Sequence, residues 1–275
     1  MKADNRAAEM ITSMAESIPV RVISEPLVSY GKKSLYADAL SAMRVSGFDV
    51  MGVTDASGHV IGFIDAKATA DGTCGDAKHL RMIPPEMLVT DSMPLAEAGF
   101  LVARSRRIFI LERNKITSIV TRADLQKAPV RMMIFGTITV LEMYLTDVLR
   151  REWPGEEWHE YGPFTPKQVK AIEDAFRQAQ KRNDETDVFG CMNLYDKCLL
   201  ACATDNVVAS LRTKGFEDLE SKLAAIRTLR NAVAHGTSLV ASNRSWNKVL
   251  HIAVTAQHLA QALESMLERD TGAQS

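Results

Sequence analysis

The residues best suited to carry out chemistry lie together at positions 229–236, which read Leu-Arg-Asn-Ala-Val-Ala-His-Gly. The guanidinium of an arginine can hold a phosphate through paired N–H donors, and a histidine can accept or release a proton near neutral pH. Arg230, Asn231 and His235 could therefore act together on a phosphodiester. The same residues also suit an ordinary helix end, because histidine is favourable in a last turn and glycine directly after it.

The apolar pattern around this stretch predicts how a helix would present the three side chains. Apolar residues recur at the spacing of one helix face, at Leu219, Leu223, Ile226, Leu229 and Val233. Asn231 and His235 then share a face away from this stripe, and Arg230 lies at its edge. An arginine at a buried margin needs a partner, such as an acid, a neighbouring subunit or a bound anion. We expect a productive site to require a second copy of the chain.

The bulk composition is that of a soluble globular chain without a general attraction to nucleic acid. The 275 residues hold 33 Lys and Arg against 34 Asp and Glu, a formal net charge of −1, so a nucleic-acid surface must be local. There is no apolar run of about 18 residues or more, and charges near the start replace the apolar core of a signal peptide. We expect a cytoplasmic protein that has no membrane partner.

The four cysteines predict neither disulfides nor a metal site. Cys191, Cys198 and Cys202 recur at the spacing of one helix face, and Cys74 stands apart. A thiolate metal site needs paired ligands on a turn and a fourth ligand nearby, and the sequence offers neither. We expect buried, reduced cysteines and no metal.

The N-terminal part of the chain alternates strand-like and helix-like segments and then repeats them in the same order. After a short amphipathic helix over residues 1–18, the first copy has a strand-like piece at 20–23, an extended piece at 25–28, a helical stripe at 35–43 and a hairpin at 49–64. The second copy has an extended piece at 86–89, a helical stripe at 95–102 and a hairpin at 107–120. Gly62–Asp65 aligns with Ser118–Thr121 in a repeat of about 56 residues. A pseudo-twofold pair of small units is predicted.

This order, ending in Ile-Val-Thr-Arg-Ala-Asp-Leu at 119–125, resembles the cystathionine-β-synthase-type (CBS) domain, and residues 19–130 resemble a tandem CBS pair of βαββα type. The resemblance implies an adenine nucleotide of the AMP or ATP type as a regulatory ligand between the repeats. Thr121 would lie near its phosphates, Asp124 would accept hydrogen bonds from its ribose, and Arg122 lies between them in the same site.

The first copy departs from this pattern, since Asp65 and Ala68 stand where the threonine and the aspartate would be. An aspartate would repel a phosphate, so one nucleotide site per chain is expected rather than two. A second interpretation of Thr121 and Asp124 remains open, namely a helix N-cap followed by a first-turn acid with no ligand.

From residue 131 onward the sequence is helical. One buried stripe is formed by Ile134, Ile138, Leu141, Leu145 and Leu149. Further helices are expected from about residue 165 to 182, over 192–203, around the 229–236 stretch, and from the loop at 236–245 to about residue 268. This predicts a bundle of four or five helices over 131–275, with a polar tail. The whole chain is expected to be an α+β two-domain protein with an N-terminal helix at 1–18, a repeated α/β domain at 19–130 and an all-α bundle.

An Arg-Asn pair, three residues and then His, within a helical bundle, resembles the HEPN superfamily. The resemblance implies a metal-independent endoribonuclease that needs no cofactor for catalysis and acts as a homodimer. His235 would be the general base or acid for attack by the RNA 2′-hydroxyl, Arg230 would hold the phosphate, and Asn231 would orient the other groups. RNA and not DNA is the expected partner, because only RNA has that hydroxyl. Such proteins typically act in stress, antiviral defence or toxin systems.

Two other functions fit the same sequence. The chain could be a non-catalytic nucleotide sensor whose bundle serves dimerisation or docking, or an RNA-binding scaffold without turnover. The aromatic loop with Trp153, Trp158, His159 and Tyr161 could stack on RNA bases, or it could pack on its own bundle.

Overall fold

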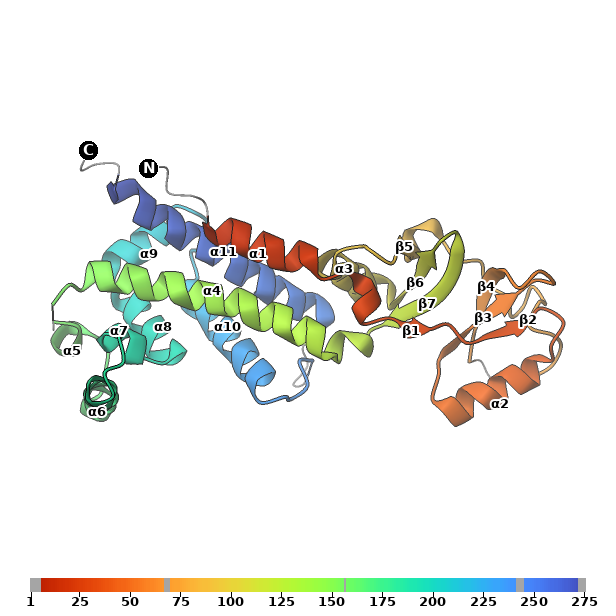
Figure 1. The fold of residues 1–275 in the computed structure, drawn as a ribbon, viewed down its shortest axis with the longest axis horizontal. Helices are drawn as coiled ribbons and strands as arrows, with labels where there is room; N and C mark the ends of the chain where they lie inside the picture. The colour runs from red at the N-terminus through yellow and green to blue at the C-terminus, as the bar shows by residue number, and fades with distance from the viewer. Residues whose placement is uncertain (1–5, 67–69, 156, 241–244, 272–275) are drawn as a thin grey trace. The chain divides into compact units, whose positions relative to one another are not determined.

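The computed structural model describes residues 6–66, 70–155, 157–240 and 245–271. The chain forms two compact units, one of residues 16–130 and one of residues 1–15 with 131–275 (Figure 1). Helix α1 (Arg6–Ser17) begins in the second unit, where Ile11 is 2% exposed. The separate N-terminal helix predicted for residues 1–18 is therefore an element of the helical unit over most of its length, because its apolar side needs a core to cover it.

The α/β unit consists of two copies of one arrangement, in which a short strand, a helix and two hairpin strands follow one another. The first copy contains β2 (Ser29–Gly31), α2 (Tyr36–Ser46), β3 (Val50–Thr54) and β4 (Val60–Asp65). The second contains β5 (Leu88–Thr90), α3 (Leu95–Ser105), β6 (Arg107–Glu112) and β7 (Lys115–Thr121). The 3-10 turns η2 (Pro85–Met87) and η3 (Asp124–Gln126) precede β5 and follow β7. The predicted repeat is present.

The registers of the two sheets match each other. The sheets have the strand orders β2-β3-β4 and β1-β7-β6-β5, where β1 (Glu25–Pro26) precedes the first copy but pairs with β7. In each copy the first strand runs parallel to the second, and the hairpin pair is antiparallel with a register shift, at Val53/Thr54 and at Ile110/Leu111. Asp65 pairs with Val50 as Thr121 pairs with Arg107, so Asp65 and Thr121 occupy equivalent positions.

Residues 20–23 were predicted to be strand-like, and this prediction is wrong. Val20–Val22 form the 3-10 turn η1. Val20 and Ile23 are both fully buried, whereas Val22 is largely exposed. Buried residues three apart suit one turn of 3-10 helix, in which side chains at this spacing eclipse.

The second unit is helical throughout the part that the structure describes. Besides α1 it contains α4 (Ala128–Glu152), α5 (Trp158–Tyr161), α6 (Pro166–Lys181), α7 (Val188–Cys191), α8 (Leu194–Ala203), α9 (Asp205–Arg212), α10 (Leu219–Ala234) and α11 (Trp246–Thr271). Helix α10 packs against α8, α9 and α11. The predicted stripe of α4 is buried, and Thr165 caps α6 in a capping box with Gln168.

The single cysteine face predicted over 191–202 is wrong, because two helices cover this range. Cys191 ends α7, and the Asn193 side chain accepts hydrogen bonds from the amides of Tyr195 and Asp196 to begin α8. Cys74 and Cys198 are buried, whereas Cys191 and Cys202 are half-buried, and all four are free thiols. In the described residues no group of three or more His, Cys, Asp or Glu side chains could hold a metal ion.

Helix α4 is long and apolar enough to cross a membrane, by length and composition alone. Its most apolar window has a mean hydropathy of 1.5, and 56% of that window is buried inside the molecule. The core helix of a soluble protein meets the same criterion, so this is weak evidence for a membrane span.

Candidate functional site

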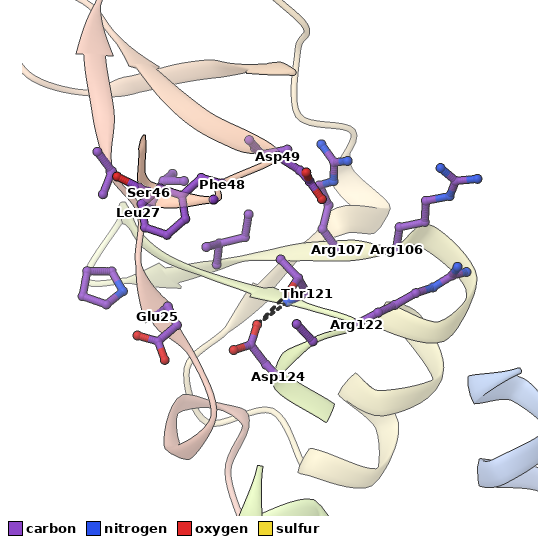
Figure 2. A pocket seen from close by; sticks show the side chains of 16 residues that line it. Glu25, Leu27, Ser46, Phe48, Asp49, Arg106, Arg107, Thr121, Arg122 and Asp124 are labelled. Carbon is purple, nitrogen blue, oxygen red and sulfur yellow. Dashed lines mark hydrogen bonds between the residues drawn. The ribbon is translucent and has the colours of Figure 1, made fainter. Parts of the chain in front are cut away.

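A cavity of about 500 Å³ lies within the α/β unit (Figure 2). Four segments line it: residues 25–28 around β1, residues 46–50 at the end of α2 and the start of β3, residues 106–107 at the start of β6, and residues 119 and 121–124 at the end of β7. Both repeats therefore contribute to its walls. Thr121, Arg122 and Asp124, which the sequence predicted as nucleotide-binding residues, all line it.

Asp124 is held in place by its neighbours in sequence. Its Oδ2 atom accepts hydrogen bonds from the amide of Thr121 at 2.7 Å and from the Thr121 hydroxyl at 2.9 Å (Figure 2). Its Oδ1 atom lies 2.8 Å from Nζ of Lys127. The threonine hydroxyl thus donates a hydrogen bond to the acid. It does not act as an N-cap, which would accept a hydrogen bond from a backbone amide of the helix. The acid begins the 3-10 turn η3 and not an α-helix.

Lys127 connects Asp124 to Glu25, which lies on another of the segments that line the cavity. Its ammonium donates to the carbonyl of Ile23 at 2.7 Å and also contacts the carboxylate of Glu25. Burial lowers the pKa of Lys127, but the bonds to Asp124 and Glu25 outweigh it and raise the pKa overall. The lysine therefore stays charged and partly neutralises two acids that line the cavity.

Three arginines line the cavity, and their surroundings differ. Arg107 forms an ion pair with Asp65 at 2.5 Å and lies over the ring of Phe63. Arg122 donates to the carbonyl of Ala103. Arg106 is exposed, and its guanidinium makes no ion pair or hydrogen bond with another described residue. Of these three arginines, Arg106 alone has a guanidinium that no described residue engages.

The equivalent position of the first repeat is filled by an ion-pair cluster. Asp65, which replaces the threonine there, accepts from Arg107 and also from Arg81 at 2.9 Å. Arg81 forms an isolated β-bridge with Phe63 of β4. In the second repeat, Glu25 pairs in the same way with Ile119 of β7. The carboxylate is thus neutralised by two guanidiniums, and the matching Ala68 lies outside the described residues.

In the helical unit, Arg230, Asn231 and His235 lie where the sequence placed them on α10. Asn231 and His235 are exposed and one turn apart, since the amide of His235 donates to the carbonyl of Asn231 at 3.0 Å. Arg230 is half-buried, and its guanidinium makes no hydrogen bond or ion pair within the described part of the chain. Whether these three residues form a catalytic site stays a prediction.

The end of α10 also has a complete structural explanation. His235 is its C-cap, and Gly236 follows with a φ of +66°. The amides of Gly236 and Thr237 donate to the carbonyls of Val233 and Ala232, which is the Schellman arrangement. Arg131 of α4 reaches the same end and donates to the carbonyls of Ala232 at 3.3 Å and Thr237 at 2.8 Å. The histidine therefore lies on a firmly held helix terminus.

The two tryptophans of the aromatic loop, Trp153 and Trp158, both contact other residues of the helical unit. Trp158 is 3% exposed and contacts Phe164 edge to face, and the indole of Trp153 donates to Thr204 Oγ1 at 3.0 Å. Trp158 is therefore covered by its own unit, and the stacking interpretation is wrong for this residue. Trp153 is half-buried, and its role in RNA stacking stays a prediction. The side chain of Tyr161 lies outside the description.

The sequence interpretation overlooked Glu25, Arg106, Arg107 and Lys127. A signal for the two arginines was available, because they lie at the junction of the helix and the first hairpin strand of the second repeat, next to the predicted site. Glu25 and Lys127 gave no such signal. They meet because strand β1, which holds Glu25, pairs with β7 of the second repeat, and no local pattern shows this pairing.

No protein-family model matches this sequence, and no curated protein matches it. Several solved structures are similar to part of the chain. A CBS domain protein of unknown function from Thermoplasma acidophilum is 15% identical, with 43% of this chain and 75% of that one covered and a TM-score of 0.34. The protein CBSX2, solved in complex with AMP, is 20% identical, with 42% and 97% covered and a TM-score of 0.35. A CBS domain protein from Pyrobaculum aerophilum, also solved with AMP, is 13% identical, with 39% and 90% covered and a TM-score of 0.34.

Proposed function

We propose that the α/β unit binds one adenine nucleotide per chain in the cavity at Thr121 and Asp124, as a regulatory ligand. The observation that carries the proposal is the convergence in one cavity of a hydroxyl, a fixed carboxylate, guanidiniums and an apolar wall. Its volume of about 500 Å³ lies within the usual range of small-molecule sites. The resemblance of residues 119–125 to the CBS pattern supports the same position.

The lining groups match the parts of a nucleotide. Leu27, Val28 and Phe48 supply apolar surface for a base, and Phe48 is 44% exposed, which leaves its ring available for stacking. Asp124 can accept further hydrogen bonds from ribose hydroxyls, because a carboxylate has about four acceptor positions. The guanidiniums suit the phosphates.

Calorimetric titration of the full chain with AMP, ADP and ATP tests this proposal. We expect saturable binding of at least one of them with a stoichiometry of one per chain, and a loss of about tenfold or more for Asp124→Ala. Arg104→Ala removes an exposed arginine of α3 that does not line the cavity and should bind as the wild type does. Absence of binding by all three nucleotides would exclude the proposal.

A second candidate function is metal-independent cleavage of RNA by the helical unit, with His235 moving the proton, Arg230 holding the phosphate and Asn231 orienting them. The observation that favours it is Arg230, a half-buried guanidinium that no described side chain neutralises, beside two exposed polar side chains. A guanidinium in this position suits a phosphate of the substrate.

The test is an RNA cleavage assay in EDTA, with DNA of the same sequence as the negative substrate. Arg230→Ala and His235→Ala should each abolish cleavage. Arg212→Ala and His258→Ala replace exposed residues of α9 and α11 and serve as matched controls. Cleavage that persists in the Arg230/His235 double variant would reject the assignment, and nucleotide binding without any cleavage would favour a non-catalytic sensor.

A further inference from the structure

The backbone of Arg106 is held in a conformation that arginine normally avoids. Its φ of +72° places it in the left-handed region, where it forms the C-cap of α3 and its amide donates to the carbonyl of Val102. The equivalent C-cap of α2 in the first repeat is Gly47, with a φ of +68°. Glycine is the usual residue there because it has no Cβ to clash. The second repeat therefore keeps an arginine where the first repeat has the less strained choice.

The strained residue Arg106 lies at the cavity. Arg106 and Gly47 both line the cavity, and strained residues of this kind often occur at ligand sites. Figure 2 shows the side chains of Arg106 and Arg122 extending to the same side, beyond Thr121. Of the three lining arginines, Arg107 is already paired with Asp65, and Arg122 is engaged by Ala103.

Three acids also line the cavity, and two of them have a basic partner. Glu25 and Asp124 share Lys127, and Asp49 lies on the wall formed by the start of β3. A phosphate chain would be attracted to the unpaired guanidinium of Arg106. We propose that Arg106 contacts the terminal phosphates of the bound nucleotide and so sets the preference for nucleotides with two or three phosphates over AMP. This inference rests on the proposed function.

The test compares Arg106→Gly with Arg113→Gly by calorimetric titration of the full chain with AMP, ADP and ATP. Arg113 is a matched control, because it is also exposed, has a φ of +47°, belongs to the same unit and does not line the cavity. Both variants remove one positive charge and relieve a left-handed residue. Both should therefore melt within about 4 °C of the wild type or above it, which guards against loss of folding.

We expect Arg106→Gly to weaken ATP binding by about tenfold, equivalent to about 1.4 kcal/mol, and AMP binding much less, whereas Arg113→Gly should leave both unchanged. Equal affinity of Arg106→Gly and the wild type for ATP, or an equal loss for AMP and ATP, would overturn the inference while leaving the proposed function in place. Failure of the wild type to bind any of the three nucleotides would instead overturn both.

Discussion

Thr121 donates two hydrogen bonds to one oxygen of Asp124, from its amide at 2.7 Å and from its hydroxyl at 2.9 Å. The pair fixes the turn that leads from β7 into η3. The second oxygen lies 2.8 Å from the ammonium of Lys127. The carboxylate is 10% exposed, so these three donors replace much of the water that it would have when unfolded. A residue predicted to recognise a ligand is thus also a structural residue of the α/β unit.

Asp124→Ala should therefore destabilise the α/β unit as well as weaken nucleotide binding by about tenfold or more. It leaves the amide of Thr121 without its acceptor and removes one of the three partners of the Lys127 ammonium, at a cost of about 1–3 kcal/mol. Thr121→Val keeps the acid and the amide bond and should cost only about 1 kcal/mol. All three tryptophans lie in the helical unit, so hydrogen exchange of peptides from residues 16–130 is the suitable measurement.

The control for this prediction is Asp91→Ala. Its carboxylate is 36% exposed and lies 3.8 Å from Arg21, a surface pair that contributes little. Exchange in Asp124→Ala that is as slow as in Asp91→Ala would show that the Thr121–Asp124 pair does not stabilise the unit.

Asp65→Asn should change nucleotide affinity in the opposite direction. Asp65 neutralises Arg107, which lines the cavity, so the neutral amide should leave Arg107 more attractive to phosphate and strengthen ATP binding severalfold. The variant should also be less stable by about 1–3 kcal/mol, because Arg81 and Arg107 lose their common negative charge and one of the two oxygens that accept from them. Titration calorimetry measures the affinity, and the stoichiometry should stay at one. Weaker ATP binding by a folded Asp65→Asn variant would contradict this role for Asp65.

The repeat and its hairpins could be predicted because residues close together in the sequence determine them. Asp55–Gly58 is a turn sequence between apolar strands, and residues 118–121 repeat residues 62–65. Residues 20–23 were misread because four apolar-rich residues fit a strand or a 3-10 turn equally well. The cysteine face was misread because helical spacing alone does not reveal that the Asn193 side chain starts a new helix.

The site could be predicted only in part, for a related reason. Thr121 and Asp124 interact with each other within one turn, so their spacing carried the signal. Arg107 is neutralised by Asp65, 42 positions away in the other repeat, and no local pattern shows such a pairing. The significance of Arg106 lies in its backbone conformation, which arginine rarely adopts and which sequence therefore does not suggest.

Asp196 gives a prediction for the dependence of stability on pH in the helical unit. It is 5% exposed, and burial raises its pKa above the usual value although hydrogen bonds from Asn193 and Gln168 oppose the shift. The folded state therefore binds the proton more tightly than the unfolded state. Stability contributed by this group is present below about pH 4, falls as the pH rises through the raised pKa, and stays lower at neutral pH.

Asp196→Asn should remove this pH-dependent loss of stability, because the amide does not ionise. Compared with the wild type, the variant should therefore be at least as stable at pH 7, and its advantage in stability should be smaller or absent at pH 3. Denaturation at both pH values, followed by tryptophan fluorescence, reports on this unit because it holds every tryptophan of the chain. Glu217→Gln changes an exposed acid and should leave the difference between the two pH values unaltered. A variant that is less stable than the wild type at pH 7 would show that the ionised carboxylate stabilises the fold.

The end of α10 gives the last prediction, which separates positioning from chemistry. Arg131 donates to the carbonyls of Ala232 and Thr237 on either side of His235, and a positive charge there also favours the negative end of the helix. Arg131→Ala should therefore loosen the last turn of α10 by about 1 kcal/mol, measured as faster hydrogen exchange of the amides of residues 233–237. If the chain cleaves RNA, this variant should retain weakened cleavage, because Arg230 and His235 remain but are less firmly placed. Complete loss of cleavage with unchanged exchange would instead place Arg131 in contact with the substrate.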